Sequence, residues 1–184
     1  MTGEKAYPSL LDAKRRVITA ICVLYRQDRE LLSMDANERS ITHKLAEYLQ
    51  DEFPDWNVDC EYNRLGGIPK RLLIRFSDEV DPKSTEAITV FPDIIVHRRG
   101  TKQNLIVIEV KKASGQSNSD QSKTKDIVKL EEFTRDPNYK YLYGLLLKLN
   151  FNGSSQLKLY LDGEEKEDWG KDLQKRLKGP GYEV

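Results

Sequence analysis

The most informative stretch of the sequence is Ile88–Lys112, which reads ITVFPDIIVHRRGTKQNLIVIEVKK. Its two apolar, β-branched runs are typical of strands, and the Gly100-Thr101 step between them is typical of a turn. We therefore predict a central hairpin over this stretch. If the hairpin pairs symmetrically around Thr101, Asp93 lies opposite Glu109, with the two Cβ atoms about 5 Å apart.

Lys111 shares a strand face with Glu109, because successive side chains of a strand point to opposite faces. Two neighbouring carboxylates among Ile and Val side chains repel each other and are costly to bury, which calls for a cation between them. Mg²⁺, or Mn²⁺ in its place, prefers oxygen ligands, which Asp93, Glu109 and the Val110 backbone carbonyl could supply. Lys111 could orient or help deprotonate a water and hold a phosphate, as metal-assisted phosphodiester hydrolysis requires.

Patterns on both sides of the hairpin predict an α/β protein with a central mixed sheet flanked by helices. The further strands, each an apolar or alternating run, are predicted at about 57–64, 71–76, 139–150 and 156–163. The helices, each marked by apolar residues at helical spacing, are predicted at about 9–30, 37–52, 121–135 and 164–178. The second helix has Asp35 or Asn37 as its expected N-cap. A length of 184 residues fits one domain.

The pattern Pro92-Asp93, fifteen residues, then Glu109-Val110-Lys111 resembles the PD-(D/E)XK, or restriction-endonuclease-like, nuclease superfamily. The resemblance covers a core at about 37–150, and the helices at 9–30 and 164–178 are then additions to that core. The strings PDIIVHRRG, NLIVIEVKK and DIVKLEEFT look like those of small stand-alone prokaryotic members. The resemblance implies a restriction-endonuclease-like three-layer fold, in which a central mixed sheet is flanked by helices.

The same resemblance implies a Mg²⁺-dependent nuclease site. Asp93 and Glu109 would bind the metal ion, and Lys111 would serve the attacking water. A carboxylate on the helix before the sheet often joins them, and Glu38 fits that place, with Glu47 as the alternative. The implied reaction is in-line attack of a metal-activated water on a phosphodiester, which leaves a 5′-phosphate and a 3′-hydroxyl.

The implied partner is a nucleic acid, with DNA favoured over RNA. A homodimer is an option, because two copies can cut both strands. The rival interpretation is a binding or regulatory module that keeps the nuclease fold without turnover. Binding of Mg²⁺ or Mn²⁺ at Asp93 and Glu109 would separate the two interpretations.

Charge is unevenly spread along a chain whose formal net charge is zero. Residues 97–129 contain eight Lys or Arg against three acids, whereas residues 28–62 contain ten acids against three bases. The basic segment predicts contacts with the phosphates of a nucleic acid, although a solvated surface explains any single lysine equally well. The candidates for phosphate contact are Arg98, Arg99, Lys112, Lys123 and Lys125.

Several classes of protein are excluded by what the sequence lacks. Cys22 and Cys60 have no CxxC spacing, and His43 and His97 are the only histidines, so neither a disulfide scaffold nor a zinc site is expected. This cysteine usage favours a reducing, cytoplasmic setting. No stretch approaches the roughly 18 apolar residues of a membrane span, and the first residues lack the apolar core of a signal peptide. We therefore expect a cytoplasmic protein with no membrane partner.

Overall fold

The computed structural model describes residues 6–34, 37–62, 64–65, 68–69, 71–73, 87–89, 91–112, 120–152 and 154–179. Within these ranges the chain forms five helices and ten strands. The helices are α1 (Leu10–Gln27), α2 (Arg29–Ser33), α3 (Glu38–Glu52), α4 (Asp120–Arg135) and α5 (Gly170–Leu177). The strands are β1 (Asn57–Cys60), β2 (Arg64–Leu65), β3 (Ile68–Pro69), β4 (Arg71–Leu73), β5 (Ala87–Thr89), β6 (Ile94–His97), β7 (Asn104–Lys112), β8 (Tyr143–Leu149), β9 (Gln156–Leu161) and β10 (Glu164–Asp168).

Six of the described strands form what we call the main sheet, in the order β1-β6-β7-β8-β9-β10. β7 and β8 are parallel, and the other neighbouring pairs are antiparallel. α4 connects β7 to β8, which is the helical crossover that a parallel pair needs. The predicted α/β class with a mixed sheet is therefore confirmed.

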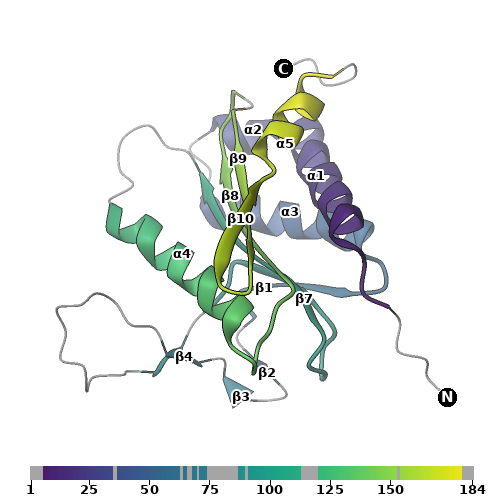
Figure 1. Ribbon diagram of the computed structural model, residues 1–184. Coiled ribbons are helices and arrows are strands. Elements are labelled where there is room, and N and C mark those ends of the chain that lie inside the picture. The colour runs from purple at the N-terminus through teal and green to yellow at the C-terminus, as the bar shows by residue number, and fades with distance from the viewer. Residues whose placement is uncertain are drawn as a thin grey trace.

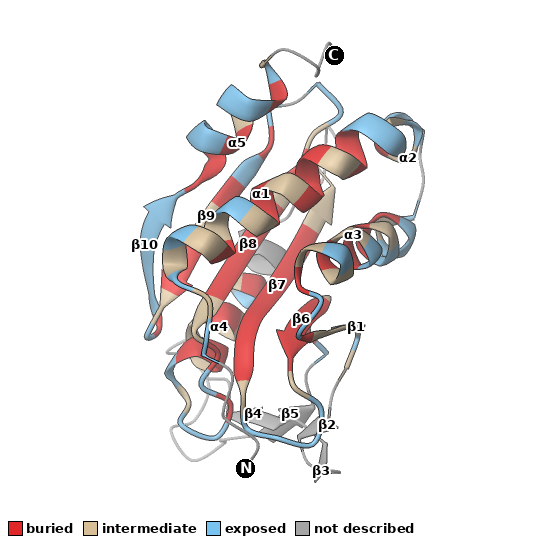
Figure 2. Ribbon diagram, turned by 90° about the vertical axis from the view of Figure 1, so that its right-hand side faces the viewer, coloured by how far each residue is buried: buried red, intermediate tan, exposed pale blue. Residues whose placement is uncertain are grey.

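The main sheet lies between two layers of helices (Figure 1). α4 covers one face, whereas α1, α3 and α5 cover the other. β7 runs through the middle of the sheet and is buried from Asn104 to Val110 (Figure 2). Its apolar, β-branched side chains point to both faces, which is the pattern of a strand covered on both sides. A strand so placed can position a polar side chain deep in the molecule.

The hairpin of β6 and β7 has the predicted register around Thr101. The pairs are Ile94↔Ile108, Ile95↔Val107 and Val96↔Ile106, followed by an irregularity at His97↔Asn104. Gly100 in the connecting turn has a φ of 73°, a conformation that glycine adopts without strain. The central prediction of the sequence analysis is thus confirmed for the backbone.

Two predicted elements near the N-terminus and the middle of the chain differ from the structure. The helix predicted over 9–30 is divided at Asp28, whose φ of −125° and ψ of 30° are not helical. Tyr48 donates a hydrogen bond to the Asp28 carboxylate and holds this break. The strand predicted at 71–76 forms β4 in residues 71–73, which pair with β5 instead of joining the main sheet. Residues 74–76 lie outside the described ranges.

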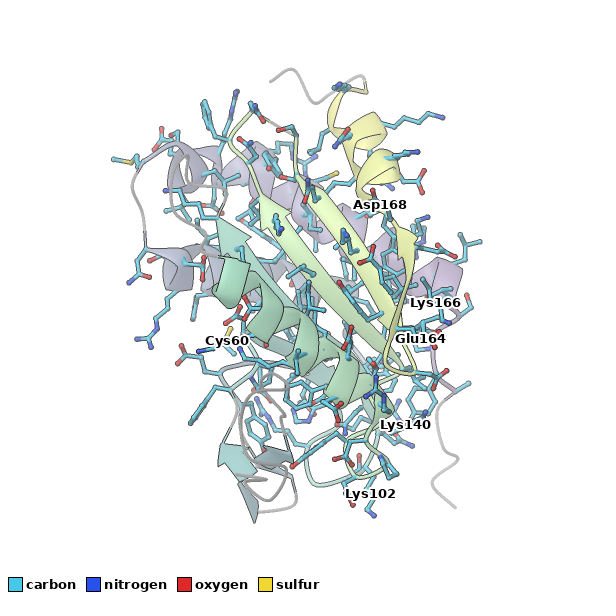
Figure 3. All side chains as sticks on the ribbon, turned by 60° about the vertical axis from the view of Figure 1, so that its left-hand side comes forward. Cys60, Lys102, Lys140, Glu164, Lys166 and Asp168 are labelled. Carbon is cyan, nitrogen blue, oxygen red and sulfur yellow. The ribbon has the colours of Figure 1, made fainter. Side chains whose placement is uncertain are left out.

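The helix predicted over 164–178 is wrong in its first part. Asp162 and Gly163 both have positive φ, at 51° and 81°, and they connect β9 to β10 as a tight hairpin turn. All five residues of β10 are exposed, and its charged side chains lie along the edge of the sheet, as Figure 3 shows for Glu164, Lys166 and Asp168. Charges at an edge discourage pairing with another chain. The helical part begins only at Gly170.

The structure also places the cysteines and histidines, for which the sequence analysis expected neither a disulfide scaffold nor a zinc site. Cys22 is buried and Cys60 is half-buried, and neither forms a disulfide bond with a described residue. His43 is exposed on α3, whereas His97 is buried at the end of β6. Among the helices of the described ranges, none is long and apolar enough to cross a membrane.

Candidate active site

β7 continues past the end of β6. Pairing between the two strands ends at Ile94↔Ile108, whereas β7 runs on to Lys112. The backbone N–H groups of β7 that follow Ile108 on the side of β6 therefore need hydrogen-bond acceptors other than β6. Asp93 Oδ2 accepts a hydrogen bond from the Val110 N–H at 2.7 Å, and Glu38 Oε2 accepts one from the Lys112 N–H at 3.1 Å. The end of β7 therefore gathers two of the predicted carboxylates.

Asp93 and Glu109 are neighbours across the hairpin, and the charge of Asp93 opposes ionisation of Glu109. Glu109 is fully buried, on the face under α4 that also holds Val107. Burial and then the charge of Asp93 raise the pKa of Glu109 to about 8. The pKa of Asp93 is also raised, mainly by burial. A half-buried and a fully buried carboxylate, both with raised pKa values, form a site that favours a cation.

Lys111 points toward carboxylates on two helices. Its Nζ lies 3.5 Å from Glu38 Oε1 on α3 and 3.3 Å from Asp126 Oδ2 on α4. Burial acts to lower the pKa of Lys111, but Asp126, Glu38 and Asp93 outweigh it, so that this pKa is raised. An ammonium group that keeps its proton can orient a water or hold a phosphate, but it is a poor base. The electrostatic role of Lys111 is therefore favoured over proton abstraction.

The two candidate carboxylates of α3 are in different places. Glu38 is the first residue of α3, directly after the N-cap Asn37, and its side chain leans over the end of β7. Glu47 instead pairs with Lys44 at 2.8 Å and with His43 at 3.2 Å. Glu47 also lines an open hollow of about 440 Å³ that includes residues of α3 and β1. Glu38, and not Glu47, belongs to the cluster at the end of β7.

Two residues of α4 join this cluster although the sequence analysis did not select them. Lys129 Nζ donates a hydrogen bond to Glu109 Oε2 at 2.9 Å and lies 3.4 Å from Asp126 Oδ1. Asp126 is buried on the same stripe of α4 as Leu130 and Phe133. A carboxylate at a position of an apolar stripe is costly unless it is paired, so the spacing did contain a signal. The prediction gave only the bounds of this helix, at about 121–135, and assigned Asp126 no role.

The charges and orphaned atoms of this cluster fit a divalent cation. The cluster contains four carboxylates and two ammonium groups, so its net charge is −2 when all of them are ionised. The carboxylates are Glu38, Asp93, Glu109 and Asp126, and the ammonium groups are Lys111 and Lys129. Among the described residues, Glu109 Oε1 is buried without a hydrogen-bond partner. Asp126 Oδ2 also lacks a hydrogen bond of good geometry to these residues, although its ion pair with Lys111 is close. Buried polar atoms are normally satisfied, so Glu109 Oε1 is a suitable oxygen ligand for a cation.

The ligand set would be incomplete with protein carboxylates alone. Among the described residues, no group of three or more His, Cys, Asp or Glu could hold a metal ion. Asp93 and Glu109 would therefore need further oxygen ligands. The Val110 carbonyl is a candidate, because the N–H and C=O of a strand residue point to the same side and the Val110 N–H faces Asp93. Water and substrate oxygens commonly complete a Mg²⁺ shell.

The predicted phosphate contacts are divided between the two ends of the hairpin. Arg98 and Arg99 follow β6, and at about 3.3 Å per residue they lie roughly 15 Å from Asp93. The Arg98 guanidinium lies 4.5 Å from the centre of the Trp56 ring, and Arg99 pairs with Asp59. The structure therefore does not bring these two arginines to the candidate site.

The lysines are closer to it. Lys112 directly follows the site on β7, and its Nζ donates a hydrogen bond to the Met34 carbonyl at 2.6 Å. Lys125 is exposed on α4, four residues before Lys129. The side chain of Lys123 lies outside the described part of the chain. The predicted phosphate contacts near the site are thus reduced to Lys112 and Lys125.

No family model matches this chain, and no curated protein sequence is significantly similar to it. The candidate site is therefore supported by the arrangement of its own residues. That arrangement unites Asp93, Glu109, Lys111 and Glu38 at one end of β7 and adds α4 as a further contributor.

Proposed function

We propose that the protein is a Mg²⁺-dependent nuclease with a restriction-endonuclease-like fold. The observation that supports this most strongly is the pair of half-buried Asp93 and fully buried Glu109, in which Glu109 Oε1 has no hydrogen-bond partner among the described residues. A buried orphaned carboxylate oxygen beside a second carboxylate is costly unless a cation completes the site. Mn²⁺ is proposed as a substitute ion, because it accepts the same oxygen ligands.

The order of elements supports the same proposal. α3, β1, β6, β7, α4 and β8 follow one another as a helix, three strands, a helix and a strand, with β4 and β5 between β1 and β6 among the described additions. This is similar to the core order of the PD-(D/E)XK superfamily. The carboxylates and Lys111 lie near the C-terminal end of β7, where β7 is no longer paired with β6.

Each residue has a distinct part in the proposed reaction. Asp93, Glu109 and the Val110 carbonyl would hold the metal ion. When bound, Mg²⁺ would activate a water and stabilise charge on the phosphate. The Lys111 ammonium would orient that water or the scissile phosphate, and Glu38 restrains this ammonium through their contact at 3.5 Å.

We propose DNA as the substrate, held along its phosphates by Lys112 and Lys125. A homodimer would allow both strands to be cut. Cysteines outside disulfide bonds are typical of the reducing cytoplasm, which we propose as the setting.

One contact favours the alternative of a non-catalytic module. The Lys129 ammonium already bonds Glu109, so a lysine could serve as the permanent counter-ion of this carboxylate. In that case the fold would bind nucleic acid or regulate a partner without turnover. The two proposals differ in whether Asp93 and Glu109 bind Mg²⁺.

The test is digestion of linear, circular, single-stranded, branched and RNA substrates with Mg²⁺, with Mn²⁺ and with EDTA. We expect cleavage that EDTA stops, and a loss of about 100-fold or more in Asp93→Asn and Glu109→Gln. Asn at position 93 can still accept the Val110 N–H, so the backbone contact is retained. Asp162→Asn is the matched control, because Asp162 is exposed and Asn tolerates its positive φ of 51°.

Cleavage by Asp93→Asn at the wild-type rate would disprove the nuclease assignment. Wild-type protein that cuts none of these substrates, yet binds DNA, would favour the binding module instead. Isothermal titration with Mn²⁺ supplies the second readout, since only the nuclease proposal requires the ion to bind.

A further inference from the structure

Lys129 holds Glu109 by one oxygen only. Its Nζ donates to Oε2 at 2.9 Å, while Oε1 of the same carboxylate is buried and has no hydrogen-bond partner within the described part of the chain. Glu109 is fully buried in the middle of the main sheet. A carboxylate fixed by one oxygen has a defined orientation, which leaves the other oxygen for a further ligand.

The fold places Lys129 over Glu109 by packing α4 on the sheet. Leu130 and Phe133 of α4 are fully buried in the apolar cluster that also contains Val107 of β7. Lys129 is the neighbour of Leu130, and its side chain is only 23% exposed. A long lysine side chain can bury its stem against apolar surface while its ammonium reaches a charge. The position of Lys129 is therefore set by the packing of α4.

Asp126 connects Lys129 to the lysine of β7. Its Oδ1 lies 3.4 Å from Lys129 Nζ, and its Oδ2 lies 3.3 Å from Lys111 Nζ. Asp126 is 5% exposed, so both ion pairs lie in a region of limited water access. One carboxylate of α4 thus restrains both ammonium groups of the site.

We infer that Lys129 is a positioning residue for the metal ligand Glu109, and that Asp126 restrains Lys129 and Lys111 together. This inference rests on the proposed function, because it assigns a role toward the proposed metal ion. Lys129 fixes Oε2 of Glu109 and directs Oε1 to the cation. Residues that bind metal ligands in this way typically contribute 10-fold to 100-fold to metal affinity.

The charges indicate that Lys129 stays in place when the ion binds. The four carboxylates and two lysines carry two negative charges when all are ionised, which a divalent cation neutralises without the departure of either lysine. Displacement of Lys129 would leave a buried group of unbalanced charge, which is costly. Lys129 is therefore a partner of the metal site and not a competitor for it.

The experiment measures Mn²⁺ affinity by isothermal titration, without substrate. We expect Lys129→Met to bind Mn²⁺ about 10-fold more weakly and Lys129→Arg to bind within about threefold of wild type, because Arg retains a charged donor. Lys140→Met is the matched control, since Lys140 pairs with Asp162 at 2.6 Å beyond the C-terminal end of α4 (Figure 3). Circular dichroism in EDTA checks that each variant is folded. Lys129→Gln is the second variant, with the same loss expected, if the Met variant does not fold.

Each outcome supports or overturns the inference. Weaker Mn²⁺ binding by Lys129→Met, together with near-wild-type Mn²⁺ binding by Lys129→Arg, supports the inference. Unchanged Mn²⁺ affinity in Lys129→Met would mean that Lys129 forms only a structural ion pair. Tighter Mn²⁺ binding by Lys129→Met would mean that Lys129 competes with the ion. Either result overturns the inference but leaves the nuclease proposal intact. Wild-type protein that binds no Mn²⁺ would overturn both proposals.

Discussion

Two polar clusters lie at opposite ends of the β6–β7 hairpin, and they differ in how their charges are satisfied. At one end, both oxygens of Asp59 are bonded: Oδ2 accepts from His97 and from Arg99, each at 2.8 Å, and Oδ1 also accepts from Arg99. At the other end, Glu109 Oε1 accepts no hydrogen bond from the described residues. The first cluster is complete within the protein, and the second is not.

The acidities of the two carboxylates reflect this difference. Burial acts to raise the pKa of Asp59, but the hydrogen bonds from Arg99 and His97 outweigh it and hold this pKa below its usual value. Burial and the charge of Asp93 instead raise the pKa of Glu109 to about 8. A buried charge with full partners belongs to the fold, whereas one without them is a candidate for function. The same hairpin therefore carries a structural cluster and a reactive one.

The largest expected effect concerns the complete cluster. Asp59→Ala should lower the free energy of unfolding by about 2–3 kcal/mol, because it leaves the buried His97 ring and Arg99 without their acceptor. Urea denaturation followed by fluorescence measures this loss. Asp172→Ala is the control: Asp172 pairs with Lys14 but its side chain is 57% exposed, so the loss should stay below about 1 kcal/mol.

Mn²⁺ affinity should be unchanged in Asp59→Ala, since the two clusters lie at opposite ends of the hairpin. A variant of Asp59 that loses Mn²⁺ binding while folded would show that the clusters are coupled. The division into a structural and a reactive end would then be wrong.

The second effect is the pH dependence of stability in EDTA. The pKa of Glu109 is about 8 in the folded protein and near the ordinary 4.5 when unfolded, so the folded state holds an extra proton between these values. Stability should therefore fall as pH rises through this window and level off above pH 8. Between pH 6 and pH 8 the loss assigned to Glu109 is about 2 kcal/mol. Denaturation of wild type and of Glu109→Gln at both pH values isolates it, because Gln cannot ionise.

Equal pH dependence in the two proteins would mean that Glu109 is ionised throughout this range. Lys129 would then satisfy it fully, and the contrast with Asp59 would disappear. A steeper fall of the free energy of unfolding with pH in wild type than in Glu109→Gln supports the contrast between Glu109 and Asp59.

Much of this hairpin could be predicted from the sequence because its determinants are local. Two apolar, β-branched runs and a Gly-containing turn specify the register that brings Asp93 beside Val110 and Glu109. The N-terminal position of Glu38 in α3 followed from its cap residue in the same way. Both depend on neighbours within a few residues along the chain.

The missed features depend on contacts between distant segments. Lys129 reaches Glu109 only because of how α4 lies over β7, which periodicity does not specify. The number of basic residues in 97–129 led us to assign Arg98 and Arg99 to the site. In the hairpin, however, these arginines lie at the turn, whereas Asp93 and Glu109 lie at the opposite end. The Asp162-Gly163 turn was a local signal that the prediction overlooked, and for this reason β10 was not predicted.

The smallest expected effect separates the two carboxylates of α3. Glu38→Gln should weaken Mn²⁺ binding about fivefold, or about 1 kcal/mol, because it removes one charge beside Lys111 while keeping an oxygen for the Lys112 N–H. Glu47→Gln, on the same helix, should leave Mn²⁺ affinity unchanged, since Glu47 contacts Lys44 and His43 instead.

An acid in the first turn of a helix also favours the helix itself, by about 0.3–1 kcal/mol. Denaturation in EDTA measures this separate contribution of Glu38. If Glu38→Gln lowers stability in EDTA but leaves Mn²⁺ affinity equal to that of Glu47→Gln, Glu38 acts only on the start of α3. The reactive end of the hairpin then comprises Asp93, Glu109 and Lys111 with the α4 pair, and no charge from α3. If affinity falls in Glu38→Gln alone, the helix before the sheet is a part of the metal site.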